Sequence, residues 1–296
     1  MPMIICFHHN DADGRASGAI VRYALGQEVL LVESDYVGGV IPWNMVEHAQ
    51  KVIVVDFSFP LPEMQRLAEG RELIWIDHHK SAIAEMGAAA GAWPGIRDLS
   101  EAACVLTWKF FFPNKPVPQA VVLIGDRDIW RWAEADTGAF NEGLYMLNTQ
   151  ADNDSLWIPL LENDRQTLTT IISEGRRLRE ARLKNIERMV QHYGFEVGFE
   201  GHRTLAINTR GNGDLGQRGR DLGYEIVYCY SDQMQDGKLY TSVTLFSDQV
   251  DVSVIASKYG GGGHAGAAGF SFLRQGTPFP EESVVTWLPP DGQEKH

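Results

Sequence analysis

The sequence predicts an α/β domain with a mainly parallel sheet, followed by a smaller α+β domain. The length of 296 residues favours two domains over one. Short apolar runs alternate with helical patterns in the first half of the chain, which is typical of a parallel sheet covered by helices. Beyond Gly194, strand-like runs and glycine-rich segments dominate. We therefore expect an α/β domain over residues 1–163, a helical connector over 164–194 and an α+β domain over 195–296.

Four strands, with helices between and after them, are expected in the first domain. Apolar runs at residues 3–7, 29–32, 52–56 and 73–76 predict the strands, and VIVVD at 52–56 is the clearest of them. Helices are expected at residues 16–25, 62–68, 102–112 and 118–124. Ser100 is the expected cap of the third helix, and the fourth is expected to end at the acidic turn GDRDIW.

The connector reads as one long helix over residues 164–192 that stops at Gly194. It carries seven Arg or Lys residues against four acidic ones. A solvated face with i,i+4 ion pairs explains this charge, and a face that presents positive charge to a cleft is the alternative. In the last domain, strands are expected at residues 195–199, 204–208, 226–230 and 239–246, a glycine-rich loop at 211–223, and a helix capped by Asp251 at 252–258.

Composition and charge exclude several classes of protein. The net charge is −13, with −10 in residues 1–160 and −3 in residues 161–296. A protein that binds along long nucleic acid usually has a basic stripe, because phosphate neutralisation dominates its affinity. This acidic sequence shows no such stripe, which argues against that class. No apolar run reaches the ~20 residues of a membrane helix, and the first residues lack the features of a signal peptide. Because Cys6, Cys104 and Cys229 have apolar neighbours, we expect reduced thiols and a cytoplasmic location.

Acidic and histidine residues gather at four places where strands or helices are expected to end. These are His9, Asp11 and Asp13 in HNDADG, Asp56 after the third strand, the triplet Asp77, His78 and His79, and Asp126 in GDRD. In open α/β sheets, ligand sites form outside the carboxyl ends of the strands. A single Asp after a strand is usually a helix cap, and HNDADG by itself reads as a polar turn. All four places together favour a binding site.

The residue types at these places indicate a metal site. Carboxylates mixed with imidazoles suit Mn²⁺, Mg²⁺ or Zn²⁺, and the lack of thiolates argues against structural zinc. Six such ligands exceed the needs of one ion with open positions. They suit two ions ~3.5–4 Å apart with a bridging carboxylate. We expect Asp56 to be the bridge, because it stands alone at the end of a central strand.

The segments HNDADG, VVD, IDHH and GDRD resemble the successive motifs of the DHH phosphoesterases, and GGGGHAGAAG at residues 260–269 resembles the glycine-rich signature of their associated C-terminal domain. The resemblance covers nearly the whole chain and implies two Mn²⁺ ions, with Mg²⁺ or another divalent ion as substitutes. It implies that the metal ligands are His9, Asp11, Asp13, Asp56, His78 and Asp126. It also implies that His79 is a catalytic residue that contacts the substrate phosphate, and that Asp77 orients the adjacent histidine, as metal-bound imidazoles generally require.

Two positions depart from the pattern of that family. Many members carry the first histidine four residues before the first aspartate, where this chain has Phe7, so His8 is an alternative to His9. Many nano-RNase-type members carry an arginine before a serine upstream of the glycine run, where this chain has Phe246. Phe246 is expected either to stack on a base or to be a core aromatic.

The glycine-rich segments are the expected contacts for the substrate. Consecutive glycines let the backbone approach a ligand, and their N–H groups can bind an anion. The residues expected to contact the substrate are Gly261, Gly262, Gly263 and His264. Arg218, in the other glycine-rich segment, is a candidate phosphate ligand or an ordinary exposed arginine. The active site is expected in a cleft between the two domains.

The resemblance implies a manganese-dependent phosphoesterase in which a hydroxide activated by two metal ions attacks phosphorus. The preferred substrates are short oligoribonucleotides, as for an oligoribonuclease, or small nucleotides such as 3′-phosphoadenosine 5′-phosphate, and not long duplex nucleic acid or membranes. A RecJ-type single-strand DNA exonuclease and a cyclic- or linear-dinucleotide phosphodiesterase share these motifs, whereas the glycine run argues against a family pyrophosphatase. A nucleotide-binding regulator is the alternative from outside enzymology. The sequence does not decide whether the protein forms a homodimer.

Overall fold

A four-stranded parallel sheet is the centre of the first of the two units into which the chain divides, Met1–Arg179 and Glu180–His296. The computed structural model describes residues 3–35 and 40–287. The strands lie in the order β2 (Val29–Ser34), β1 (Met3–His9), β3 (Ala49–Val55) and β4 (Glu72–Ile76). All neighbours are parallel, so the carboxyl ends of the four strands share one edge of the sheet.

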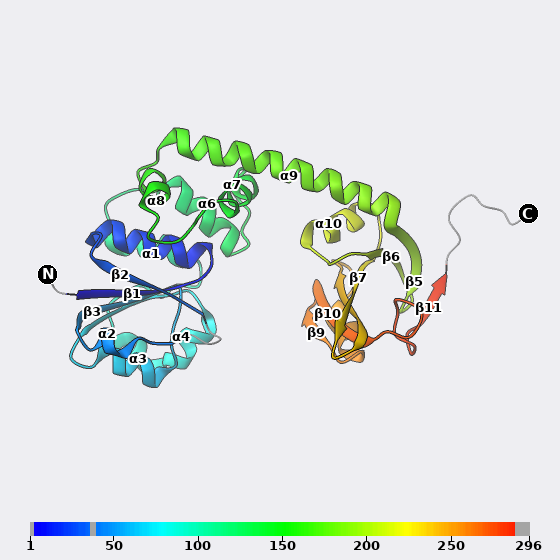
Figure 1. Cartoon of the computed structure of the whole chain (residues 1–296), viewed down its shortest axis with the longest axis horizontal. Coiled ribbons are helices and arrows are strands. Elements are labelled where there is room, and N and C mark those ends of the chain that lie inside the picture. The colour runs from blue at the N-terminus through cyan, green and yellow to red at the C-terminus, as the bar shows by residue number, and fades with distance from the viewer. Residues whose placement is uncertain (1–2, 36–39, 288–296) are drawn as a thin grey trace, which may run out of the picture. The chain divides into compact units, whose positions relative to one another are not determined.

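Helices cover both faces of this sheet, as Figure 1 shows. One side carries α1 (Ala12–Leu25), α5 (Ala103–Phe111), α6 (Gln119–Asp128), α7 (Thr137–Tyr145) and α8 (Asp154–Leu161). The other carries α2 (Trp43–Val46), α3 (Leu61–Ala68), α4 (Lys80–Met86) and the 3₁₀-helix η1 (Gly87–Ala92). A parallel sheet buried on both faces is what the continuous apolar strands predict. The predicted α/β class of this part is confirmed.

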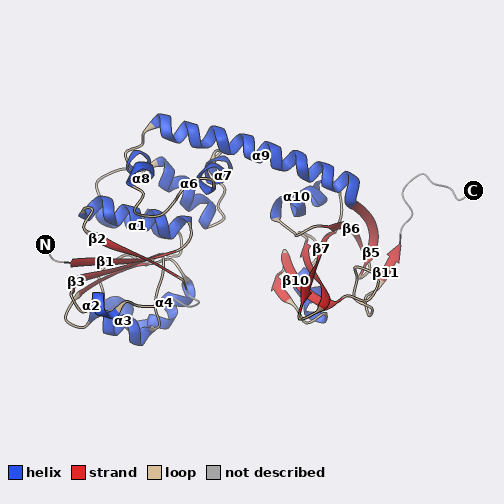
Figure 2. Ribbon diagram, viewed as in Figure 1, coloured by secondary structure: helices blue, strands red, loops and turns tan. Residues whose placement is uncertain are grey.

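The second unit is built on a separate, mixed sheet of seven strands (Figure 2). Its order is β11 (Val285–Trp287), β5 (Gly194–Phe199), β6 (His202–Asn208), β7 (Ile226–Gln235), β8 (Lys238–Phe246), β10 (Ala267–Leu273) and β9 (Gly262–His264). Only the β6–β7 pair is parallel among these described strands. The end of α9 (Arg165–Tyr193) and α10 (Gly213–Asp221) cover one face, and α11 (Val252–Lys258) covers the other. The predicted α+β class is confirmed.

The segment predicted as a glycine-rich loop is the helix α10. The side chain of Asn212 caps it by accepting a hydrogen bond from the N–H of Leu215 at 3.0 Å. Two of its glycines face the sheet. A Cβ on Gly216 would lie 2.7 Å from Cγ of Phe246, and one on Gly219 would lie 2.1 Å from Cγ2 of Val227. The glycines therefore permit close packing here, and the loop prediction is wrong.

The ends of two helices also differ from the prediction. Ser100 is not the cap of α5, because the first N–H groups of that helix, on Ala103 and Cys104, donate to the carboxylate of Asp13 at 2.8 Å. The helix α6 continues to Asp128 instead of ending at residue 124. GDRD therefore forms the last turn of α6, which changes the direction in which each of its aspartates points.

All three cysteines are free and buried. Burial raises the pKa of each thiol, that of Cys229 to about 12. Over residues 3–35 and 40–287, each helix is too short or too polar to cross a membrane.

Candidate metal centre

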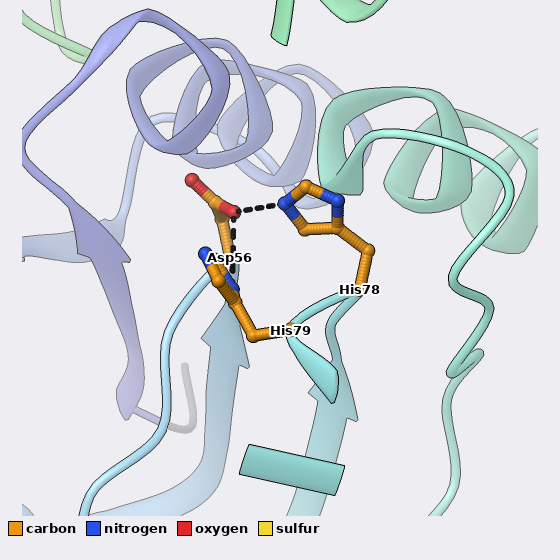
Figure 3. Close-up of side chains that lie close together, drawn as sticks. All are labelled: Asp56, His78 and His79. Atoms are coloured by element: carbon orange, nitrogen blue, oxygen red, sulfur yellow. Dashed lines mark ion pairs between the residues drawn. The ribbon is translucent and has the colours of Figure 1, made fainter. Parts of the chain in front are cut away.

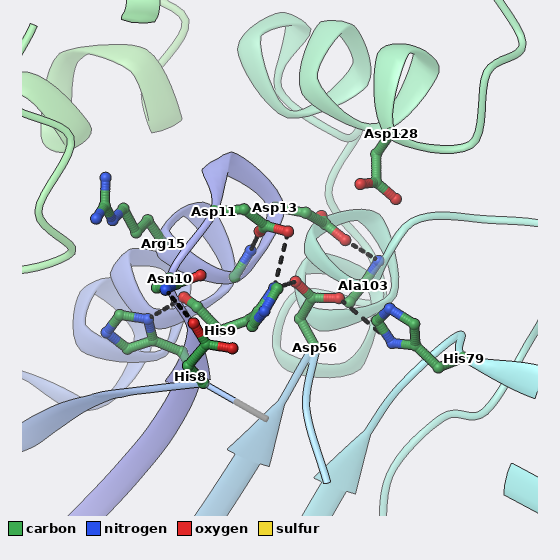
Figure 4. A network of polar contacts seen from close by, with 12 residues as sticks. His8, His9, Asn10, Asp11, Asp13, Arg15, Asp56, His79, Ala103 and Asp128 are labelled. Carbon is green, nitrogen blue, oxygen red and sulfur yellow. Dashed lines mark hydrogen bonds and ion pairs between the residues drawn. The ribbon is translucent and has the colours of Figure 1, made fainter. Parts of the chain in front are cut away.

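The first motif leaves β1 at the carboxyl edge of the parallel sheet and enters α1. Asp11 caps this helix, with Oδ1 accepting from the N–H of Gly14 at 2.9 Å, and its Oδ2 lies 2.8 Å from Nδ1 of His9. A Cβ on Gly14 would lie 2.5 Å from the carbonyl oxygen of His9. Gly14 therefore allows α1 to begin directly against the end of the strand. His9 and Asp11 are brought together as a result (Figure 4).

The structure places His9, and not His8, beside the other candidate ligands. His8 is buried, and its ring packs against Gly18 of α1. Its Nδ1 lies 2.8 Å from the carbonyl oxygen of His9, and burial lowers the pKa of His8. Nδ1 of His9 lies 3.9 Å from Oδ2 of Asp56. His9 is therefore the histidine of the first motif that reaches the cluster.

Asp56 directly follows β3 and has an unusual backbone and environment. Its φ of 54° lies in the left-handed region, which is uncommon for a residue other than glycine. The residue is 1% exposed, and both carboxylate oxygens lack a hydrogen-bond partner among the described residues. Its Oδ1 lies 3.3 Å from Nε2 of His78 and 3.9 Å from Nδ1 of His79 (Figure 3). A buried carboxylate without donors is costly, so these oxygens fit a cation.

Asp77 shapes the loop after β4. Its Oδ1 accepts from the backbone N–H groups of His78 and His79 at 2.7 and 3.0 Å, and lies 2.8 Å from Nδ1 of His79. This side-chain hydrogen bond raises the pKa of His79 and orients its ring. Nε2 of His78 lies 3.4 Å from Oδ2 of Asp128 and 3.7 Å from Oδ2 of Asp13. Asp77 therefore contacts the ring of His79, whereas the adjacent His78, which it was expected to orient, donates to it through its backbone N–H.

The structure brings Asp128, and not the predicted Asp126, to the cluster. The carboxylate of Asp126 accepts two backbone N–H groups of the following loop and the hydroxyl of Thr137. Oδ2 of Asp128 is buried without a hydrogen-bond partner among the described residues. Two residues correspond to about 200° around an α-helix, so the continuation of α6 turns Asp126 away and Asp128 inward. The structure therefore places Asp128, in place of the predicted Asp126, among the candidate metal ligands.

Three overlapping groups of side chains have ligand atoms within 4.8 Å of one another. They are His9, Asp11 and Asp56; Asp56, His78 and His79; and Asp13, His78 and Asp128. Asp56 belongs to the first and second groups, and His78 belongs to the second and third, so the three groups form one continuous cluster. Asp13 also holds two N–H groups of α5, but each carboxylate oxygen has a second lone pair for another partner.

Like charges crowd this cluster. Burial and the negative charges of Asp13 and Asp11 raise the pKa of Asp56 well above its usual range. The same causes raise the pKa of Asp128 to about 7. Carboxylates so close together need protons or a cation between them. The carboxylates and imidazoles of this cluster, with both oxygens of Asp56 and Oδ2 of Asp128 buried and unpartnered among the described residues, therefore fit divalent ions such as Mn²⁺ or Mg²⁺.

The glycine run of the second unit forms a tight hairpin. Gly262–His264 is the strand β9, and it pairs with β10 with Gly263 opposite Ala268. A Cβ on Gly261 would lie 2.1 Å from the carbonyl oxygen of Gly269, and one on Gly263 would lie 2.6 Å from Cα of Ala268. Packing therefore explains these two glycines. His264 and Gly262 are exposed, and substrate binding by the run stays a prediction.

Two further candidates are engaged within the second unit. Arg218 lies on α10, and its Nε lies 2.7 Å from Oε2 of Glu187 on α9. It is thus held in an ion pair between helices and does not lie in a phosphate-binding loop. Phe246 is 9% exposed, with its ring against Gly211 and Gly216. A buried ring offers no face to a base, so Phe246 is a core aromatic and the stacking prediction is wrong.

Similarity to known sequences is detectable but low. No family model matches the chain. One relative is an uncharacterised protein of Acanthamoeba polyphaga mimivirus, 28% identical over 233 residues; the match covers 75% of this chain, which spans only about half (53%) of that relative. Another is the oligoribonuclease NrnB of Bacillus subtilis, 23% identical over 289 residues, which are 90% of this chain and 72% of NrnB.

Two solved structures share the fold. A DHH domain from a protein described as belonging to a family of ribosomal proteins matches with a TM-score of 0.53 at 15% identity, over 92% of this chain and 83% of that one. The pGpG-specific phosphodiesterase PggH of Vibrio cholerae matches with a TM-score of 0.50 at 14% identity, over 92% and 93% of the two chains. At these identities the likeness concerns the fold alone.

Proposed function

We propose that this chain is a metal-dependent phosphoesterase of the DHH type that hydrolyses phosphodiester bonds of short oligoribonucleotides with two divalent ions, preferably Mn²⁺. The observation that carries the proposal is the buried cluster around Asp56, where carboxylates crowd and neither oxygen of Asp56 has a donor within residues 3–35 and 40–287. The likeness to an oligoribonuclease supports the substrate class.

In the proposed centre, Asp56 would help to hold both divalent ions. His9 and Asp11 complete one site, and Asp13, His78 and Asp128 complete the other. When bound, the two ions would supply a water nucleophile of lowered pKa and stabilise charge on the phosphoryl oxygens. The protein holds the ligands in place through backbone donors, as at Asp13, where α5 fixes the carboxylate.

His79 is the proposed catalytic contact to the substrate phosphate. Asp77 accepts from the Nδ1 of His79, which orients the imidazole and raises its pKa. A protonated imidazole beside the cluster can donate to a non-bridging phosphoryl oxygen and stabilise the charge that develops there. Asp77 acts through His79 and is a positioning residue.

Charge supports short substrates over long ones. The net charge is −13, and an acidic protein gains little from the phosphates of a long strand. In the proposal, Gly262 and His264 on the exposed hairpin contact the terminal nucleotide. A phosphodiesterase for linear dinucleotides is the second candidate, favoured by the fold likeness to PggH.

One Mn²⁺-supplemented assay tests the proposal against its alternatives. The panel contains di- to pentaribonucleotides, a single-stranded DNA of ~20 nucleotides, cyclic and linear dinucleotides, and 3′-phosphoadenosine 5′-phosphate. We expect turnover of the ribonucleotides to be lost in EDTA and to be highest for the shortest chains. Turnover confined to dinucleotides would select the second candidate. Strongly salt-dependent turnover of the long DNA would favour a RecJ-type exonuclease, and no turnover of any substrate would contradict the proposal.

A further inference from the structure

The loop after α6 carries two exposed tryptophans, which follow the candidate ligand Asp128 by two and four residues. Trp130 is 77% exposed and Trp132 is 43% exposed. Two virtual bonds of 3.8 Å limit the distance between the Cα atoms of Asp128 and Trp130 to about 7.6 Å. Large aromatic side chains that stand in solvent next to a catalytic cluster indicate a contact with a ligand or partner.

The backbone of this loop is strained at both tryptophans. The φ angles of Trp130 and Trp132 are 54° and 52°, a region that favours glycine or asparagine and that bulky residues rarely adopt. Strain of this kind gathers at functional sites, where the surrounding structure maintains it. The fold therefore holds these two rings in a conformation that the local sequence does not prefer.

Asp126 is the residue that maintains the strained loop. Its carbonyl oxygen accepts from the N–H groups of Arg131 and Trp132 at 3.0 and 3.3 Å. Its carboxylate accepts from the N–H groups of Ala133 and Glu134 at 2.9 and 3.1 Å. The side chain of Arg131 also donates to the carbonyl oxygen of Ser100 at 2.8 Å. The loop is thus fixed relative to Asp128, which precedes it on α6.

The two rings do not have equivalent positions. Their centroids lie 5.7 Å apart at an interplanar angle of 68°, an edge-to-face arrangement. Cζ3 of Trp132 lies 3.8 Å from the place that a Cβ on Gly138 would take, so Trp132 packs at the start of α7. Trp132 therefore supports the pair, and Trp130 presents the more exposed ring.

We propose that Trp130, supported by Trp132, is a stacking platform for a nucleobase of the substrate, next to the phosphate bound at the metal centre. Stacking on an aromatic face tolerates every base, because each base has a π-face. The platform therefore favours short nucleotides without strong discrimination among bases. This inference rests on the proposed phosphoesterase function and adds to it a subsite in the first unit.

Steady-state kinetics with Mn²⁺ test the platform. The substrates are a linear diribonucleotide and its analogue in which both bases are replaced by hydrogen. We expect Trp130→Ala to raise KM for the diribonucleotide roughly ten-fold, with kcat within about two-fold and no change for the abasic analogue. Trp130→Phe should recover most of the lost affinity. Tyr145→Ala, which removes another exposed aromatic ring of the first unit, should leave KM unchanged.

A second variant separates stacking from folding. Asparagine tolerates the left-handed conformation of position 130, so Trp130→Asn should have a Tm at least equal to that of the native chain while KM rises as in Trp130→Ala. Unchanged KM in both variants, or a fall in Tm without a change in KM, would overturn the platform and indicate a structural contact. If the native chain hydrolyses neither substrate, the proposed function fails; calorimetric titration of the diribonucleotide then tests the platform, and equal affinity for native and Trp130→Ala protein would refute it.

Discussion

The metal centre of the first unit and the glycine-rich hairpin of the second unit are both dense in motif residues, yet their side chains and backbones have different kinds of partners. At the metal centre, buried oxygens of Asp56, Asp77 and Asp128 lack hydrogen-bond donors among the described residues. In the hairpin, close backbone contacts account for Gly261 and Gly263. Buried polar atoms in folded proteins are nearly always paired. A motif residue that the fold leaves unpaired therefore points to a ligand more strongly than one that packing already requires.

Removing the charge of Asp56 tests this comparison most severely. In Asp56→Asn, we expect turnover of a short oligoribonucleotide to fall at least 10³-fold, or about 4 kcal/mol, because both proposed ion sites lose a ligand. In EDTA, the free energy of unfolding should rise by ~1 kcal/mol or more, because a buried carboxylate of raised pKa is removed. Initial rates in Mn²⁺ and thermal unfolding in EDTA measure the two effects. A loss of both activity and stability would show that Asp56 is structural.

Metal binding should stabilise the first unit in a pH-dependent manner. Mn²⁺ at 100 times its Kd adds about 2.7 kcal/mol to the free energy of unfolding, and EDTA should remove it. The pKa of Asp128 is raised to about 7, so without metal its contribution to stability is lost as pH rises through 7. Protons compete with the ion below that pH. The Mn²⁺-induced rise in Tm should therefore be larger at pH 8 than at pH 6, and the opposite order would contradict this assignment.

Substitution of the two aspartates of GDRD should have different effects, one mainly on Mn²⁺ binding and the other mainly on stability. Asp128→Asn should weaken Mn²⁺ affinity about 10- to 100-fold, as loss of a support or ligand at a metal site does, with little loss of stability. Asp126→Asn should destabilise the protein by about 1–3 kcal/mol, because its carboxylate accepts several donors of the loop, and should bind Mn²⁺ more tightly than Asp128→Asn. Calorimetric titration and chemical denaturation measure these quantities. The reverse pattern would restore Asp126 as the ligand.

Two alanine substitutions in the glycine run, Gly261→Ala and Gly262→Ala, form a matched pair for which we expect the smallest effects. A Cβ on Gly261 would clash with the backbone of β10, whereas one on Gly262 meets no atom within 4 Å. We expect Gly261→Ala to cost about 1–2 kcal/mol of stability and Gly262→Ala to change stability by less than about 0.5 kcal/mol. If the run binds substrate, Gly262→Ala should nevertheless raise KM for the oligoribonucleotide. Unchanged KM in a fully stable Gly262→Ala protein would assign the run to packing alone.

Local patterns predicted most of the fold and much of the cluster. The strands of the first unit end within two residues of the predicted apolar runs, and His9, Asp11, Asp13, Asp56 and His78 converge because parallel strands share a carboxyl edge. The choice between the two aspartates of GDRD depended on where α6 stops, and helix ends are poorly determined by local sequence. The cap of α5 comes from Asp13, about ninety residues away along the chain, which no local pattern can reveal.

The glycines of residues 211–223 led to the wrong prediction of a loop for a physical reason. In α10, Gly216 and Gly219 serve the contact with β7 and β8, although glycine lowers the helix propensity of any isolated segment. The tryptophan platform escaped prediction because left-handed backbone at Trp130 and Trp132 leaves no mark in composition. The signal in the sequence was the pair of tryptophans directly after the acidic motif.

The buried state of the three native cysteines makes the protein suited to selective labelling. Their raised pKa values keep the thiols protonated at neutral pH, and the thiolate is the form that reacts with maleimides and iodoacetamides. A cysteine introduced at an exposed position in each unit, such as Tyr145→Cys and Met234→Cys, would therefore react first, without removal of Cys6, Cys104 or Cys229. A donor and an acceptor dye at these two positions would report, by energy transfer, any change in the distance between the units when Mn²⁺ or a nucleotide is added.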